Sequence, residues 1–140
     1  MPLTKPSEIF QRKIAAAHEE YLQTPTSERK ANGLAIALND HAEWTFLYHK
    51  GKGDSDRLHG AISAMEFREK LFGTCPELRM MWDLADADKH RLLDNPTHSV
   101  RASTAAYVIQ GDDLIVTAPY NQSFSKAAAT AADFWKGWPD

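Results

Sequence analysis

Residues that could carry chemistry gather in one segment, residues 76–93. This segment contains Asp83, Asp86, Lys89 and His90. Because Asp86 and His90 follow Asp83 by three and seven positions, a helix would place these three on one face. Two carboxylates and an imidazole can bind a divalent metal ion or transfer protons. The alternative is a solvated helix face, whose ion pairs are worth only about 0.2–0.5 kcal/mol each.

His41 is a second candidate. It lies between Leu38 and Thr45 on an apolar stripe of helical spacing. If that helix packs on residues 76–93, His41 faces Asp83 or Asp86. The predicted metal site is then His41, Asp83, Asp86 and His90, with a divalent metal ion as the cofactor. A purely structural network is the alternative, because an unsatisfied buried imidazole nitrogen costs about 1–3 kcal/mol.

Several well-known site patterns are missing from the sequence. No Glu is followed three residues later by His, which argues against a ferritin-like di-iron centre. The single cysteine, Cys75, excludes a zinc finger, and His-Glu-x-x-His is absent. Glycine-rich nucleotide loops and the Gly-x-Ser-x-Gly elbow are also absent. Because these motifs are absent, the sequence motifs do not assign a reaction to the protein.

The spacing of apolar residues, together with residues that start helices or form turns, predicts the helices and strands that position these side chains. Apolar spacing and helix-start residues predict helices over residues 7–22, 26–50, 59–72, 76–93 and 124–135. Gly111-Asp112 is typical of the turn in a two-residue hairpin, with a strand on either side. The predicted fold is mostly α: a bundle of four helices, a β-hairpin at about residues 99–119 and a C-terminal helix, forming one domain over residues 1–140.

Composition limits the partners. The chain has 140 residues and a formal net charge of −3, so no overall basic field attracts DNA. No apolar run reaches the roughly 18–20 residues of a membrane span, and the N-terminus lacks a signal pattern. A single cysteine fits a reducing compartment. We therefore expect a cytoplasmic protein that binds neither membrane nor DNA.

Aromatic residues point to association. The second predicted helix is apolar over much of its circumference from Trp44 to Tyr48, which predicts that one side is covered by a second subunit. Trp138 is expected either to pack into the bundle or to lie at an interface. A homodimer or a partner protein is the expected assembly.

Two stretches resemble a motif of small bacterial proteins. Cys75-Pro76-Glu77-Leu78 and the residues from Asp83 to His90 are similar to Cys-Pro-Glu-Leu followed by Asp-Ile-Ala-Asn-Ala-x-Lys-His. Residues 37–44 and 133–135 are similar to the Leu-x-x-Trp and Phe-Trp segments of that group.

More distantly, the chain resembles HEPN-like domains, several of which are RNases or components of toxin–antitoxin and phage-defence systems. HEPN RNases have an Arg that four to six residues separate from the His, whereas the corresponding residues before His90, residues 83–85, are Asp, Leu and Ala. The resemblance implies a helical bundle in which the corner formed by Lys89 and His90 is important.

Three hypotheses follow. The first is a helical module that acts by protein association, in a defence or stress context. The second is a HEPN-like RNase, which makes RNA a partner; His90 would be the general acid–base and Lys89 or Arg91 would hold phosphate. Asp86 is the further expected catalytic residue. The third is a metal-dependent enzyme that uses the His41, Asp83, Asp86 and His90 cluster.

Overall fold

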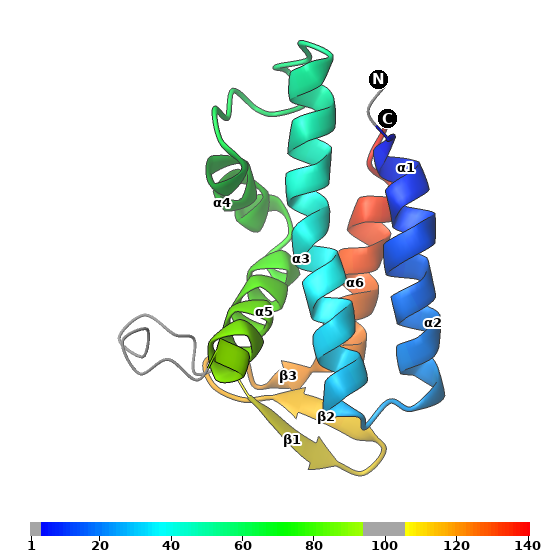
Figure 1. The fold of residues 1–140 in the computed structure, drawn as a ribbon. Coiled ribbons are helices and arrows are strands. Elements are labelled where there is room, and N and C mark those ends of the chain that lie inside the picture. The colour runs from blue at the N-terminus through cyan, green and yellow to red at the C-terminus, as the bar shows by residue number, and fades with distance from the viewer. Residues whose placement is uncertain (1–3, 94–105) are drawn as a thin grey trace.

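A computed structural model describes residues 4–93 and 106–140, with only the backbone of residues 89–93. The described chain is mostly helical with a small antiparallel sheet, which confirms the predicted class (Figure 1). The elements in order are α1 (Pro6–Ile9), η1 (Phe10–Ala15, a π-helix), α2 (Ala16–Gln23), α3 (Glu28–Gly51), α4 (Ala64–Thr74), α5 (Glu77–Leu93), β1 (Tyr107–Gln110), β2 (Asp113–Val116), β3 (Gln122–Ser123) and α6 (Phe124–Lys136).

Serine side chains start three of the helices. Ser27, Ser63 and Ser123 accept hydrogen bonds from the backbone N–H three residues later, at 3.1–3.3 Å. Each bond satisfies one donor that the first helical turn leaves open. The predicted start of α4 at residues 59–61 is wrong, because His59 and Gly60 have φ values of 53° and 76° and Ser63 is the cap.

The N-terminal helix begins differently from the prediction. Lys5 is the capping residue and Pro6 occupies the first helical position, where no N–H is needed. Ser7, in the first turn, donates its hydroxyl to the carboxylate of Asp140 at 2.6 Å. This bond joins the first turn of α1 to the last residue of the chain, and Figure 1 shows α1 beside the C-terminal end.

The sheet has three strands where the sequence predicts two. β1 and β2 form the predicted hairpin around Gly111, whose φ is 64°. β3 then pairs antiparallel with β2, Ser123 standing opposite Ile115. Ser123 is therefore both a strand residue and the cap of α6. The predicted strand residues 99–105 lie outside the part of the chain that the structure describes.

α3 is the centre of the packing. It contacts α2, α4, α5 and α6, so its buried residues meet helices on several sides. Leu34, Leu38, Phe46 and their neighbours are almost completely buried. The sheet lies at the lower end of α3 and α5 in Figure 1, with β1 outermost. Among the described residues, none of the helices has the length and apolar character needed to cross a bilayer.

Candidate functional site

The predicted helix over residues 76–93 is present as α5, but its acidic residues hold the sheet in place. The hydroxyl of Tyr120 donates to the Asp83 carboxylate. Asn32 donates to Asp88 at 3.0 Å and accepts from the hydroxyl of Tyr107 at 2.7 Å. Burial and the Asp83 carboxylate both raise the pKa of Tyr120, so it remains a hydrogen-bond donor at neutral pH. These contacts join α3, α5 and the residues around the hairpin.

His41 does not meet these carboxylates. Its ring is 1% exposed and lies edge-on to Trp135 at 4.7 Å and to Phe10 at 6.4 Å. Neither ring nitrogen reaches a hydrogen-bond partner. Burial lowers the pKa of His41 to about 4, so the imidazole is neutral at pH 7. His41 therefore packs among aromatic rings from η1 and α6.

The predicted metal site is not assembled from its described members. Among the residues with described side chains, no three of His, Cys, Asp or Glu come close enough to share a metal ion. His41 and Asp83 face different neighbours, and Asp86 is half-buried. The side chains of Lys89 and His90 lie outside the described residues, so their catalytic roles, and that of Asp86, stay predictions.

Two further buried polar residues follow His41 along α3. Thr45 and His49 come at intervals of four and are completely buried, which makes one polar row along the helix. His49 accepts a hydrogen bond from the Trp138 indole at 2.9 Å through Nε2. Burial lowers the pKa of His49, and the Asp54 carboxylate partly opposes this effect. Trp138 thus packs onto the helices, the first of the two places that the sequence allowed.

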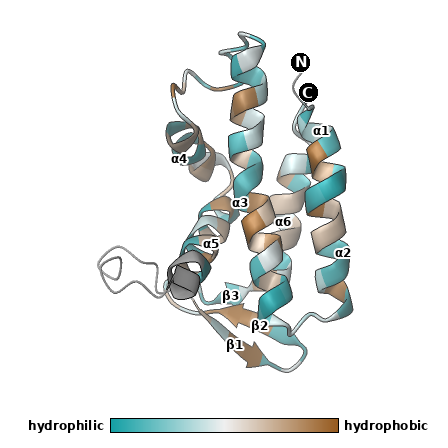
Figure 2. Ribbon diagram, viewed as in Figure 1, coloured by the Kyte–Doolittle hydropathy of each residue, from teal (hydrophilic) through white to brown (hydrophobic). Residues whose placement is uncertain are grey.

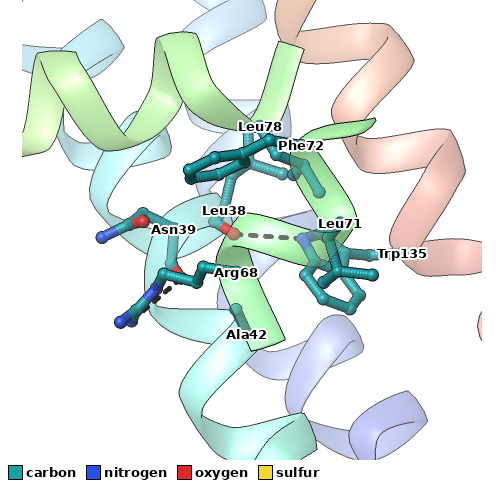
Figure 3. Close-up of a pocket in the computed structure, with 8 residues that line it drawn as sticks. All are labelled: Leu38, Asn39, Ala42, Arg68, Leu71, Phe72, Leu78 and Trp135. Carbon is teal, nitrogen blue, oxygen red and sulfur yellow. Dashed lines mark hydrogen bonds between the residues drawn. The ribbon is translucent and has the colours of Figure 1, made fainter. Parts of the chain in front are cut away.

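A small pocket opens between α3 and α4 (Figure 3). The space not filled by atoms is about 190 Å³, and this volume includes the part in front of the pocket that is open to solvent. The Arg68 guanidinium lies beside Asn39 at one side of the pocket, and apolar side chains form the other side. The residues that line it are Leu38, Asn39, Ala42, Arg68, Leu71, Phe72, Leu78 and Trp135.

The outer strand of the sheet carries exposed apolar side chains. Val108 and Ile109 are 55% and 61% exposed, and they point to opposite faces because they are consecutive in β1. Trp44 and Leu47 on α3 are also half-exposed, at 49% and 44%. Trp44 belongs to the surface that the sequence predicts for association, whereas the sequence predicts no functional role for Val108, Ile109 or Arg68. The adjacent β-branched residues before Gly111 predict the strand that exposes them. Nothing in the sequence marks Arg68 as a pocket residue.

No protein-family model, curated protein or solved structure matches this chain. The resemblance to HEPN-like domains therefore stays a prediction.

Proposed function

We propose that this protein acts by association and that β1 receives the β1 strand of a second copy. The observation that carries the proposal is an edge strand with exposed apolar residues. Within the described residues, β1 is hydrogen-bonded on one side only, to β2. Its four residues, Tyr107 to Gln110, include no charge and no proline. Charges and prolines are the usual means by which proteins protect an edge from further pairing.

The direction of the backbone groups supports pairing at Ile109. The Thr117 N–H donates to the carbonyl of Ala106 at 2.9 Å, so the polar groups of residue 106 face β2. Because these groups alternate in direction along a strand, those of Val108 also face β2 and those of Ile109 face outward. An antiparallel pair between two copies of Ile109 would form two backbone hydrogen bonds about a two-fold axis.

Charge does not oppose this pairing. Each chain has a net charge of −3, but β1 itself is uncharged. With Ile109 at the axis, the two Asp112 turns lie on opposite sides of it, roughly 15 Å or more apart at about 3.3 Å per residue. That distance exceeds the screening length of about 8 Å at physiological salt. Figure 2 shows β1 in the brown of hydrophobic residues at the outer edge of the sheet.

The test is the mass of the protein in solution. Ile109→Lys places two ammonium groups opposite each other across the axis, which destabilises the pair. Sedimentation equilibrium should give twice 15.7 kDa for the wild type and 15.7 kDa for Ile109→Lys. Ile62→Lys is the matched control, because Ile62 is 80% exposed and lies outside the sheet; this variant should remain dimeric.

Two results contradict the proposal. One is a wild-type mass of 15.7 kDa at every concentration. The other is a dimer that Ile109→Lys leaves intact and Trp44→Lys dissociates, which would assign the interface to the exposed face of α3. Circular dichroism of each variant checks that its helices are retained.

A further inference from the structure

The segment that follows α6 is held against the helices at two points. The Trp138 indole N–H donates to Nε2 of His49 on α3 at 2.9 Å. Further along, the Asp140 carboxylate accepts the Ser7 hydroxyl at 2.6 Å and the Ser7 backbone N–H at 3.0 Å, both from α1. Pro139, between the two points, is exposed. The segment therefore depends on these two contacts and on the packing of the Trp138 ring.

The contact with His49 requires a neutral imidazole. An indole N–H can only donate, so Nε2 of His49 must accept and must carry no proton. The proton of the neutral ring is then on Nδ1, which has no hydrogen-bond partner among the described residues and lies 3.7 Å from the Asp54 carboxylate. A second proton would go to Nε2 and point at the indole N–H. The bond to Trp138 is therefore lost whenever His49 is protonated.

Burial determines the pH range in which this happens. The His49 ring is 0% exposed, and the Trp138 ring packs edge-on against it at 6.1 Å. Four charged side chains act on His49: Asp54, Lys52, Arg57 and Asp140. Burial outweighs the two carboxylates and lowers the pKa of His49 from 6.5. The contact is therefore complete above pH 6.5 and is lost as the pH falls through the lowered pKa.

The contact with Ser7 persists in more acidic solution. Burial favours the protonated form of Asp140, but the two hydrogen bonds from Ser7 outweigh it and keep the pKa of Asp140 below 3.8. Mild acid therefore breaks the bond to Trp138 while Asp140 still holds the chain.

The Trp138 ring covers aromatic residues of the core. It lies 5.7 Å from the Phe67 ring, 5.8 Å from Trp135 and 5.9 Å from Phe134. Phe67 and Trp135 are 0% and 2% exposed. Their burial depends in part on Trp138 remaining in place.

We propose that residues 138–140 form a proton-sensitive latch, in which protonation of His49 releases the Trp138 ring and uncovers the aromatic rings beneath it while the helices remain folded. Asp140 keeps the segment on α1, so the latch closes again when the pH rises. Figure 1 shows the C-terminal end of the chain at the opposite end of the bundle from the sheet. The test of the latch therefore does not depend on association through β1.

The experiment lowers the pH from about 7 and follows the indole N–H signals by ¹H–¹⁵N NMR, while circular dichroism records the helices. A neutral gadolinium chelate broadens the signals of groups near the solvent. Below pH 6.5 the Trp138 signal should shift with the same midpoint as the ¹⁵N signal of His49 Nε2, and should broaden as strongly as that of Trp44, which is 49% exposed. The Trp135 indole donates to the Leu38 carbonyl, which does not titrate, so its signal should stay unchanged until the helices unfold.

Two variants identify the group that titrates. His49→Gln provides an amide oxygen as acceptor and takes up no proton in this range, so Trp138 should stay in place until the helices unfold. His59→Asn is the matched control, because the His59 ring also packs edge-on against Trp138, at 6.5 Å. Asparagine tolerates the φ of 53° at this position, and in this variant the Trp138 signal should titrate as in the wild type.

A Trp138 signal that titrates with His49 in the wild type and in His59→Asn, but not in His49→Gln, supports the proposal. Three results overturn it: Trp138 and Trp135 signals that change only together as the helices unfold, a Trp138 signal that stays unchanged while His49 takes up a proton, or a titration that His49→Gln leaves intact. The first two come from the wild type alone, so they apply even if His49→Gln does not fold.

Discussion

Acid should destabilise the fold through His41, and His41→Leu should remove this part of the pH dependence. The imidazole is 1% exposed between Phe10 and Trp135, and burial lowers its pKa from 6.5 to about 4. Between these two values the unfolded chain holds a proton on His41 that the folded chain does not. Stability that is complete above pH 6.5 is therefore lost as the pH falls towards 4.

The size of this effect follows from the two pKa values. They differ by about 2.5, and one pKa unit corresponds to about 1.4 kcal/mol at 25 °C. His41 alone should therefore remove about 3 kcal/mol of stability between pH 7 and pH 4. A typical domain has a total stability of about 5–15 kcal/mol, so the loss is a measurable part of the whole.

Urea unfolding at pH 7 and pH 4, followed by circular dichroism, measures this loss. The free energy of unfolding of the wild type should fall by about 3 kcal/mol more than that of His41→Leu. His18→Leu is the control, because it also replaces an imidazole by leucine but at a side chain that is only half-buried, on α2. The loss of stability of this variant should equal that of the wild type. Equal losses in the wild type and His41→Leu would refute the reasoning, since acid would then be acting through other groups.

Three further predictions concern two side-chain hydrogen bonds and a pair of glycines. Tyr120→Phe removes the hydroxyl that donates to a carboxylate on α5, and should lower the free energy of unfolding in urea by about 1–2 kcal/mol; an unchanged midpoint would show that this bond contributes nothing. Trp138→Ala removes ring packing and the hydrogen bond to His49, and should cost about 2–3 kcal/mol by thermal denaturation. Gly111→Ala should cost about 1–2 kcal/mol because φ is 64°, whereas Gly33→Ala within α3 should stabilise by up to about 1 kcal/mol. An unchanged or increased free energy of unfolding in Gly111→Ala would contradict the left-handed conformation of the Gly111 turn.

The helices could be predicted because their signals are local. Ser27 and Ser123 cap helices within four residues, and the apolar spacing of α3 repeats along its own length. The hairpin was predictable for the same reason, since Gly111-Asp112 determines the turn. β3 could not be predicted, because a strand of two residues shows no alternation of apolar and polar positions. Its pairing also depends on the chain turning back onto β2 after residue 116.

The candidate site was harder to predict because it depends on how helices face each other. The sequence places Asp83 on α5 correctly, but its partner is Tyr120, 37 residues away. His41 was expected to face α5, yet the rotation of α3 directs it towards Phe10 and Trp135. Spacing within one helix shows which residues share a face, but it does not show which neighbour that face meets.

Hydrogen exchange of individual β1 amides tests the proposed association most directly. The Val108 N–H faces β2, so it should be protected at every protein concentration. In the proposed dimer the Ile109 N–H faces the second copy, so its protection should increase as the concentration rises and the mass doubles. An Ile109 amide that exchanges equally fast in dilute and concentrated protein, while the mass doubles, would contradict pairing through β1.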